Sequence, residues 1–274
     1  IIPNRGAWLE YETDSNDIIW VRLDRARKLC LTTLLRALGY ETDDDIRNLL
    51  GNDKRLEATM AKDTTVAEAS KDRGGAVRTL REQALLIIYK KQKPDEPESV
   101  ESATNMFKSL FYDPKRYDVM RVGRYKFNKK LTIWSRAKGQ KLAMPVADPT
   151  TGEIVFEDGH VLTAADCAEL DAIGVYEITV ALESGETLKI FTNKMCDMSR
   201  YVDFDPREKC GIKERVCKSV LEELLAKYEG EELKEAIRDN ADRLAPKHIL
   251  ADDILASINY MNALAHGIVT KDDI

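Results

Sequence analysis

The residues best suited to binding chemistry are concentrated in one basic window, residues 115–130. This window holds seven Lys or Arg residues and one acid, a formal charge of +6 in a chain of net charge −6, so the remainder sums to −12. Tyr117, Tyr125 and Phe127 lie among these charges. Cations contact phosphates and flat aromatic faces stack on bases, so the pattern fits a local polyanion site. A solvated basic turn between two helices would carry the same charges, and composition does not separate these two interpretations.

Signatures of catalysis are absent from the sequence. It contains no GxGxxG, GxxxxGK[ST], HExxH or GxSxG motif, and no convincing nucleophile–base pair. Asp203 and Asp205 are spaced so that they could hold Mg²⁺ beside a phosphate ligand, but a polar loop has the same composition. Five cysteines without a CxxC pair, with only three histidines, predict reduced thiols rather than a zinc site or a disulfide framework. These features favour a binding domain over an independent metal-dependent enzyme.

Composition bounds the class of protein. The 274 residues are 43% hydrophobic and 33% charged, which is typical of a globular chain with one large domain or two small ones. No apolar run approaches the roughly 20 residues of a membrane-spanning helix. The chain opens at Ile1 and closes at Ile274 as if both ends were cut from a longer polypeptide. Helical and strand-like patterns occur in separate stretches, so we expect an α+β fold.

The elements that must position the basic window begin with a β-hairpin over residues 7–24. Apolar positions alternate with polar ones on both sides of the turn at residues 13–17, so one face is buried. The other face carries Trp8, Trp20 and Arg22 outward or toward a partner. Packing of these tryptophans on a neighbouring loop is an equally good interpretation.

Helices are predicted at intervals along the chain, and several have capping residues. Thr42, Ser99 and Thr163 each precede a helical pattern as N-caps. The predicted helices cover residues 32–38, 43–50, 78–92, 100–112, 213–228 and 231–244, with one after residue 163 and a last one from residue 252. Strands are predicted at residues 153–156, 175–182 and 187–192. Residues 53–78 are polar and contain glycines, with Gly74-Gly75 as an evident break.

Several stretches, in order along the chain, resemble the lobe (beta2 domain) of bacterial DNA-directed RNA polymerase beta subunits. The most specific runs from Phe111-Tyr112-Asp113-Pro114 through the basic window to Leu131. The stretches that carry the resemblance are residues 2–9, 21–28, 34–40, 100–104, 111–118, 121–131 and 252–274. The chain departs from the family at Ala26, Cys30 and Val269, where the family often has Arg, Pro and Gly.

The resemblance implies a domain division. Residues 1–131 and 248–274 correspond to the lobe, and residues 132–247 to a lineage-specific insertion, β-rich at about 140–192 and helical at about 213–244. Residues 145–154 look like an insertion of Firmicute-type beta subunits.

The resemblance also implies a role, namely a wall of the downstream DNA cleft that faces the non-template strand of promoter DNA. In the family, the residue matched by Trp8 stacks on an unpaired base, and a loop begun by Asp273 and Ile274 helps to form a base pocket. The expected DNA-binding residues are Arg5, Trp8, Arg25, Arg27, Lys93, Arg116, Arg124, Asp273 and Ile274.

The resemblance further implies an enzyme only as part of the polymerase, a nucleotidyltransferase. Its Mg²⁺ belongs to the beta-prime subunit, so no cofactor and no catalytic residue are expected in this chain. The implied partners are promoter DNA, the beta-prime and alpha subunits and sigma factor, in the cytoplasm at the nucleoid and not at a membrane. The alternative is a protein-docking module for sigma or transcription factors, with residues 140–192 as the contact and no direct DNA contact.

Overall fold

The computed structural model describes residues 1–70 and 77–268, and it has an α+β fold built as two compact units, Ile1–Asp118 and Val119–Ile274. These units are compact bodies and do not test the predicted lobe and insertion boundaries, which stay a prediction. None of the helices in the described ranges is long and apolar enough to cross a membrane.

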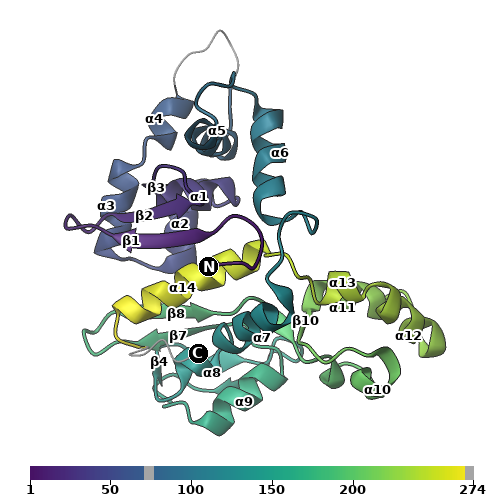
Figure 1. Cartoon of the computed structure of the whole chain (residues 1–274). Coiled ribbons are helices and arrows are strands. Elements are labelled where there is room, and N and C mark those ends of the chain that lie inside the picture. The colour runs from purple at the N-terminus through teal and green to yellow at the C-terminus, as the bar shows by residue number, and fades with distance from the viewer. Residues whose placement is uncertain (71–76, 269–274) are drawn as a thin grey trace. The chain divides into compact units, whose positions relative to one another are not determined.

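The first unit is built on the antiparallel sheet β1-β2-β3, whose hairpin confirms the one predicted at residues 7–24 (Figure 1). In the hairpin Leu9 pairs with Leu23 and Thr13 with Ile19. The strands are β1 (Leu9–Thr13), β2 (Ile19–Leu23) and β3 (Leu29–Cys30), and the helices are α1 (Leu31–Ala37), α2 (Asp43–Leu50), α3 (Lys54–Lys62), α4 (Thr65–Ala69), α5 (Leu80–Gln92) and α6 (Val100–Phe111). Helices α3 and α4 lie within residues 53–78, where the polar composition of the sequence did not predict a helix.

A buried carboxylate joins three helical segments of the first unit. The Asp63 side chain is 1% exposed and accepts hydrogen bonds from Thr32 Oγ1 at 2.8 Å, Thr65 Oγ1 at 2.6 Å and Arg36 Nε at 3.1 Å. Burial opposes the charge, but the hydrogen bonds, led by those from Thr65, outweigh it and lower the pKa of Asp63. This carboxylate therefore ties the start of α1 to the turn between α3 and α4.

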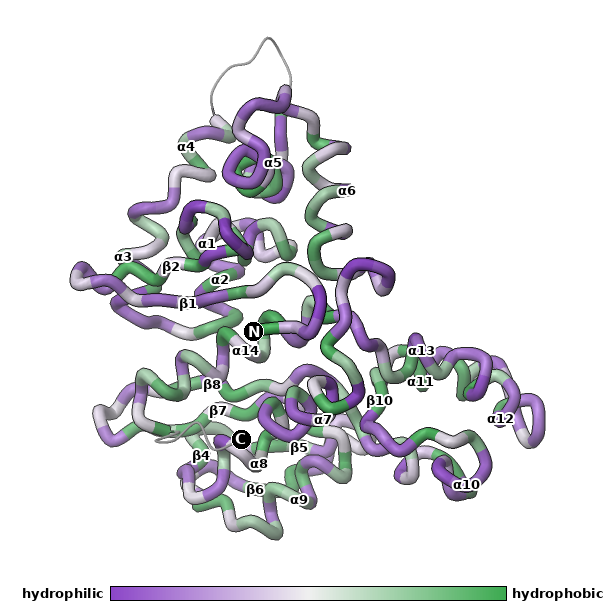
Figure 2. Tube along the Cα trace, in the orientation of Figure 1, coloured by the Kyte–Doolittle hydropathy of each residue, from purple (hydrophilic) through white to green (hydrophobic). Residues whose placement is uncertain are grey.

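The second unit contains the sheet β4-β7-β8, in which Glu177 pairs with Phe191 across β7 and β8. Strand β7 is largely hydrophobic, whereas most residues of α10 and α12 are hydrophilic (Figure 2). The strands are β4 (Lys141–Leu142), β5 (Val146–Ala147), β6 (Ile154–Phe156), β7 (Glu177–Ala181), β8 (Thr187–Phe191), β9 (Met195–Cys196) and β10 (Val216–Cys217). The helices are α7 (Met120–Lys130), α8 (Trp134–Ala137), α9 (Ala164–Ala172), η1 (Met198–Arg200), α10 (Pro206–Cys210), α11 (Lys218–Leu225), α12 (Gly230–Asp239), α13 (Ala241–Leu244) and α14 (Ala251–Ala265).

The helix predicted from residue 213 begins later than expected. Val216 pairs with Cys196 as part of β10, and α11 starts only after this strand. Strand pairing with a distant segment therefore overrode the local helical pattern.

A side-chain amide closes the edge of β8. Phe191 N donates to Asn259 Oδ1 at 3.1 Å and Asn259 Nδ2 donates to the Lys189 carbonyl at 2.8 Å, so α14 supplies the pairing that a further strand would give. The buried guanidinium of Arg136 donates to the Phe191 carbonyl at 2.8 Å and also to Asn259. Burial lowers the pKa of Arg136 to about 10, which leaves it charged at neutral pH. These contacts fix α14 against the sheet.

Candidate nucleic-acid interface

Trp8 lies immediately before β1, at one end of the hairpin in the first unit. Its carbonyl accepts a hydrogen bond from Asp24 N at 2.8 Å, and the next residue, Leu9, is 1% exposed. The backbone at Trp8 is therefore fixed, while its side chain is half-buried. Among the described residues no hydrogen bond or ring contact engages that side chain. Its indole is thus held in place without being committed to an internal partner.

Trp20 provides a contrast on the same hairpin. Its indole Nε1 donates to Asp14 Oδ2 at 2.8 Å, and Lys28 Nζ lies 4.9 Å from the ring centroid. The hydrogen bond from Trp20 lowers the pKa of the Asp14 carboxyl. Packing within the protein therefore explains Trp20, and of the two tryptophans of the hairpin segment it is Trp8 that remains a candidate for stacking on an external base.

The segment before Trp8 is paired with the start of the basic window. Arg5 N donates to the Asp118 carbonyl at 3.0 Å, and Asp118 N donates to the Arg5 carbonyl at 2.8 Å. Gly6, the residue after Arg5, has φ +126°, and a Cβ there would approach Tyr117 Cδ2 to 2.6 Å, so the close approach of the two segments requires glycine. Arg5 and Arg116 consequently come from two adjacent segments although they are far apart in sequence.

Two of the predicted residues, Lys93 and Arg116, line one open hollow of about 680 Å³ together with Gly6 and Ala7. The Arg116 side chain is 73% exposed and is oriented by a 2.8 Å hydrogen bond from Nη1 to Ser109 Oγ. Nothing in the sequence pattern pointed to Ser109, because its role depends on contact across the turn. The hollow is therefore flanked by two cations and lies directly beside the backbone that leads to Trp8.

The hollow is not uniformly positive. Lys93 Nζ lies 2.7 Å from Glu96 Oε1, and this ion pair raises the pKa of Lys93 and lowers that of Glu96. Arg116 has a longer contact, with Nε 3.8 Å from Asp113 Oδ2. Both pairs are solvent-exposed and so contribute little to stability. A phosphate would compete with Glu96 for Lys93 but would find Arg116 largely available.

Arg25 and Arg27 lie on the turn between β2 and β3, and both are exposed. This turn begins at Asp24, whose amide is bonded to Trp8, and the preceding Leu23 carbonyl accepts from Gln92 Nε2 at 2.9 Å. Gln92 is the residue before Lys93, so the hydrogen bonds connect the basic turn, the end of α5 and Trp8. No pattern in the sequence indicates this role for Gln92. The structure thus brings Trp8 and the predicted DNA-binding cations of the first unit, namely Arg5, Arg25, Arg27, Lys93 and Arg116, to one region of that unit.

Arg124 does not belong with the predicted DNA-binding residues. Its side chain is 2% exposed, and its guanidinium donates to both carboxylate oxygens of Asp253, at 2.9 and 2.8 Å, within the second unit. Its remaining donors reach the carbonyls of Pro246 and His248. A guanidinium that is buried and makes four hydrogen bonds inside the protein is not accessible to a phosphate, which contradicts the prediction that Arg124 contacts DNA. Asp273 and Ile274 lie outside the described residues, and their predicted role stays a prediction.

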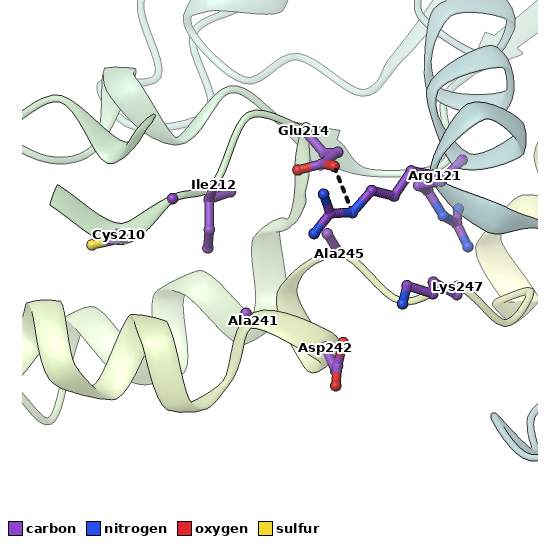
Figure 3. Close-up of a pocket in the computed structure, with 10 residues that line it drawn as sticks. Arg121, Cys210, Ile212, Glu214, Ala241, Asp242, Ala245 and Lys247 are labelled. Carbon is purple, nitrogen blue, oxygen red and sulfur yellow. Dashed lines mark ion pairs between the residues drawn. The ribbon is translucent and has the colours of Figure 1, made fainter. Parts of the chain in front are cut away.

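The second unit holds a smaller cleft of about 220 Å³ next to α7 (Figure 3). Arg121 and Glu214 approach each other across it, with Nε 3.7 Å from Oε1, and Lys247 and Asp242 lie on the opposite wall. Its charges are mixed, and its volume is below the range of about 300–1,000 Å³ that is typical of small-molecule sites. We therefore do not assign it a cofactor.

The acidic pair proposed for Mg²⁺ has a local explanation. Asp205 is the N-cap of α10, where its Oδ1 accepts from Arg207 N at 2.8 Å, and Asp203 is exposed beside it. Across residues 1–70 and 77–268, no group of three or more His, Cys, Asp or Glu side chains is arranged to hold a metal ion.

Comparisons with known proteins identify the relatives of this chain. Residues 1–144 match the sequence model of the family described as RNA polymerase Rpb2, domain 2. The chain is 46% identical over 277 residues to the DNA-directed RNA polymerase subunit beta of Acetivibrio thermocellus, and 46% identical over 275 residues to that of Alkaliphilus metalliredigens. Each match covers 100% of this chain and 21% of the relative, so the chain spans about a fifth of the length of these relatives.

Proposed function

Because this chain belongs to the RNA polymerase Rpb2 domain 2 family, we propose that it is the lobe of a DNA-directed RNA polymerase beta subunit and contacts promoter DNA. In this role it forms a wall of the downstream DNA cleft and faces the non-template strand. The observation that carries the proposal is the uncommitted indole of Trp8 beside the hollow lined by Lys93 and Arg116.

The proposed mechanism divides the work between stacking and charge. Strand separation exposes a base, and the Trp8 ring recovers stacking free energy of about 1–3 kcal/mol for one base. Arg116 holds the adjacent phosphate in a salt-dependent contact, with Arg5, Arg25 and Arg27 extending the positive surface. Lys93 contributes less, since it must leave Glu96 to bind a phosphate.

In this proposal the chain makes and breaks no covalent bond. Nucleotide addition is the activity of the assembled polymerase, whose Mg²⁺ we place in the beta-prime subunit. The lobe then works with the beta-prime and alpha subunits and sigma factor, in the cytoplasm at the nucleoid. Its contribution is to stabilise opened promoter DNA.

The test is the lifetime of the promoter open complex in a polymerase reconstituted with this segment in its beta subunit. Trp8→Ala is expected to shorten the lifetime about 5- to 150-fold, the equivalent of the stacking free energy above. Trp8→Phe keeps a flat ring and is expected to retain most of the effect.

Charge is tested separately. Arg116→Ala is expected to weaken binding for all sequences and to reduce the slope of log K against log salt by about one unit, since one phosphate contact is lost. Arg207→Ala, an exposed arginine of the second unit, is the matched control and is expected to have no effect. If neither Trp8→Ala nor Arg116→Ala changes the lifetime, the assignment of this site is wrong.

A further inference from the structure

Helix α7 carries most of the basic window, and its rotation about its own axis is fixed by buried polar contacts. Arg124 is bonded to Asp253, and the Asn128 side chain accepts from Asn193 Nδ2 at 3.2 Å. Both side chains are buried, at 2% and 3% exposure. The opposite side of the helix must therefore face away from the core of the second unit.

This outward side has an unusual combination of residues. Val122 is 66% exposed and Tyr125 is 61% exposed, and they lie one helical turn apart, so together they form a short apolar strip. Three exposed cations flank the strip at helical spacing, and α7 contains no acid. We call this surface the α7 face; it consists of Arg121, Val122, Tyr125, Lys126 and Lys129.

The charge of the α7 face is not used within the protein. Arg121 has a single long contact, 3.7 Å from Nε to Glu214 Oε1, and its side chain is 81% exposed. Among the described residues, Lys126 and Lys129 make no ion pair. By contrast, Lys130 points inward, with Nζ 4.6 Å from the Tyr260 ring centroid, and burial lowers its pKa. The cations of the α7 face are therefore available to pair with acidic side chains of a binding partner.

A small cleft adjoins the face. Arg121 also lines this cleft of about 220 Å³, where Ile212, Ala241 and Ala245 supply apolar surface. The charged groups around it are mixed, with the exposed cation of Lys247 beside the acids Glu214 and Asp242 (Figure 3). Interfaces between proteins concentrate their binding free energy where an anchor side chain fills such a cleft and polar groups surround it. The cleft and the face are continuous through Arg121.

A nucleic acid fits the α7 face less well than a protein does. Surfaces that bind single strands present successive aromatic rings for stacking, but Tyr117 is fully buried and Phe127 packs against Leu131, Ala256 and Tyr260. Of the three aromatic residues in the basic window, only Tyr125 has a largely exposed side chain. An exposed valine at the centre of the face offers nothing to a phosphate, whereas an apolar and aromatic centre with a charged rim is typical of protein–protein interfaces.

We propose that the α7 face and its adjoining cleft bind an acidic segment of another protein, one that carries a large apolar anchor residue. Acidic side chains of the segment pair with Lys126, Lys129 and Arg121, and the anchor enters the cleft. This surface belongs to the second unit, whereas Trp8 and Arg116 belong to the first, and the inference does not depend on the proposed contact with DNA.

The experiment measures binding of labelled probes to the 274-residue chain by fluorescence anisotropy. The main probe is a short peptide in which Leu and Trp, one helical turn apart, are flanked by Asp and Glu. An oligoglutamate and a single-stranded oligonucleotide, both of the same net charge, are the comparison probes. Circular dichroism of each variant checks that it is folded.

The peptide is expected to bind saturably and at least about tenfold more tightly than the oligoglutamate, because its apolar residues fill the face and cleft. The double variants V122S/Y125S and K126E/K129E are each expected to weaken peptide binding about tenfold or more. The control R200E/R207E makes the same charge change at exposed positions elsewhere in the second unit and is expected to leave binding unchanged.

Three results would overturn the proposal. One is the absence of saturable peptide binding. Another is tighter binding of the oligonucleotide with no effect of V122S/Y125S, which would make the face a phosphate-binding surface. The third is an equal loss in the control R200E/R207E, which would mean that the probes respond only to net charge.

Discussion

Replacing Arg124 with alanine distinguishes a structural arginine from a DNA contact. The guanidinium donates to the Pro246 carbonyl at 2.8 Å, to the His248 carbonyl at 2.6 Å and to both oxygens of Asp253. Arg124→Ala removes all of these donors at once. It leaves the Asp253 carboxylate, which is 0% exposed, with the Asn193 amide at 2.8 Å and the Leu250 amide at 2.9 Å.

The expected cost follows from the charge that is left behind. Breaking one half of a buried ion pair destabilises a protein by about 3–5 kcal/mol, because the remaining charge is desolvated and uncompensated. Removing both charges relieves that penalty, so the double variant R124M/D253L is expected to cost less than the sum of the two single changes. Arg124→Lys keeps the charge but cannot reach the Asp253 carboxylate and both carbonyls at once, and its stability is expected to fall between those of the wild type and Arg124→Ala.

The assay is urea unfolding of the 274-residue chain, followed by circular dichroism and by hydrogen exchange of peptides from α7 and α14. Hydrogen exchange is needed because two compact units need not unfold together. Arg124→Ala is expected to lower protection in α7 and α14 while leaving binding to single-stranded DNA unchanged at low urea. A variant of unchanged stability that bound DNA at least about fivefold more weakly would refute the structural interpretation and restore Arg124 as a contact.

Two further predictions concern stability. Because the pKa of Asp63 is held below its ordinary value of 3.8, the unfolded state binds a proton more readily, so the stabilisation is present above pH 3.8 and is lost as the pH falls through the lowered value. Asp63→Asn is expected to lower stability by about 1–3 kcal/mol, because it weakens the buried hydrogen bonds from Thr32, Thr65 and Arg36 while Arg36 keeps its ion pair with Asp43. It is also expected to flatten the dependence of the urea midpoint on pH below 3.8, and an unchanged acid dependence would contradict this. Asn259→Leu is expected to cost about 1–3 kcal/mol by leaving the Phe191 amide unpaired at the edge of β8, with faster hydrogen exchange of that amide as the readout, and unaltered exchange would show that the edge needs no cap.

Local features could be predicted from the sequence because their partners are close in the chain. The caps at Thr42, Ser99 and Thr163 are confirmed, and each side chain accepts a hydrogen bond from an amide three residues ahead. The hairpin is confirmed for the same reason, since its turn and its alternation lie within one short segment. The α+β fold class could be predicted from these local elements taken together.

Features that depend on distant partners could not be predicted. Helix α3 was missed because its helical pattern is short, with Leu56 and Met60 as its buried apolar residues, and because a contact from another element helps to hold it. Ile19 N of β2 donates to Thr59 Oγ1 at 2.8 Å, across 40 positions of sequence. Arg124 was misassigned for the same reason, because its partner lies 129 positions away. A sequence shows that an arginine is present but does not show whether a carboxylate will meet it.

The basic window shows why a count of charges does not define a site. Its first part pairs with the segment at Arg5 in one unit, and its second part forms α7 in the other. One run of like charges therefore has three different environments. Arg116 is exposed beside a hollow, and Arg124 forms a buried ion pair with Asp253. Lys126 is exposed on the outward side of α7 and makes no ion pair with the described residues. What decides among them is whether each cation already has a partner and whether an aromatic or apolar group beside it is still unused. By that criterion Trp8 with Arg116 forms one binding surface in the first unit, and Tyr125 with Lys126 forms another in the second. The double variants of the α7 face should therefore leave the open-complex lifetime set by Trp8 unchanged.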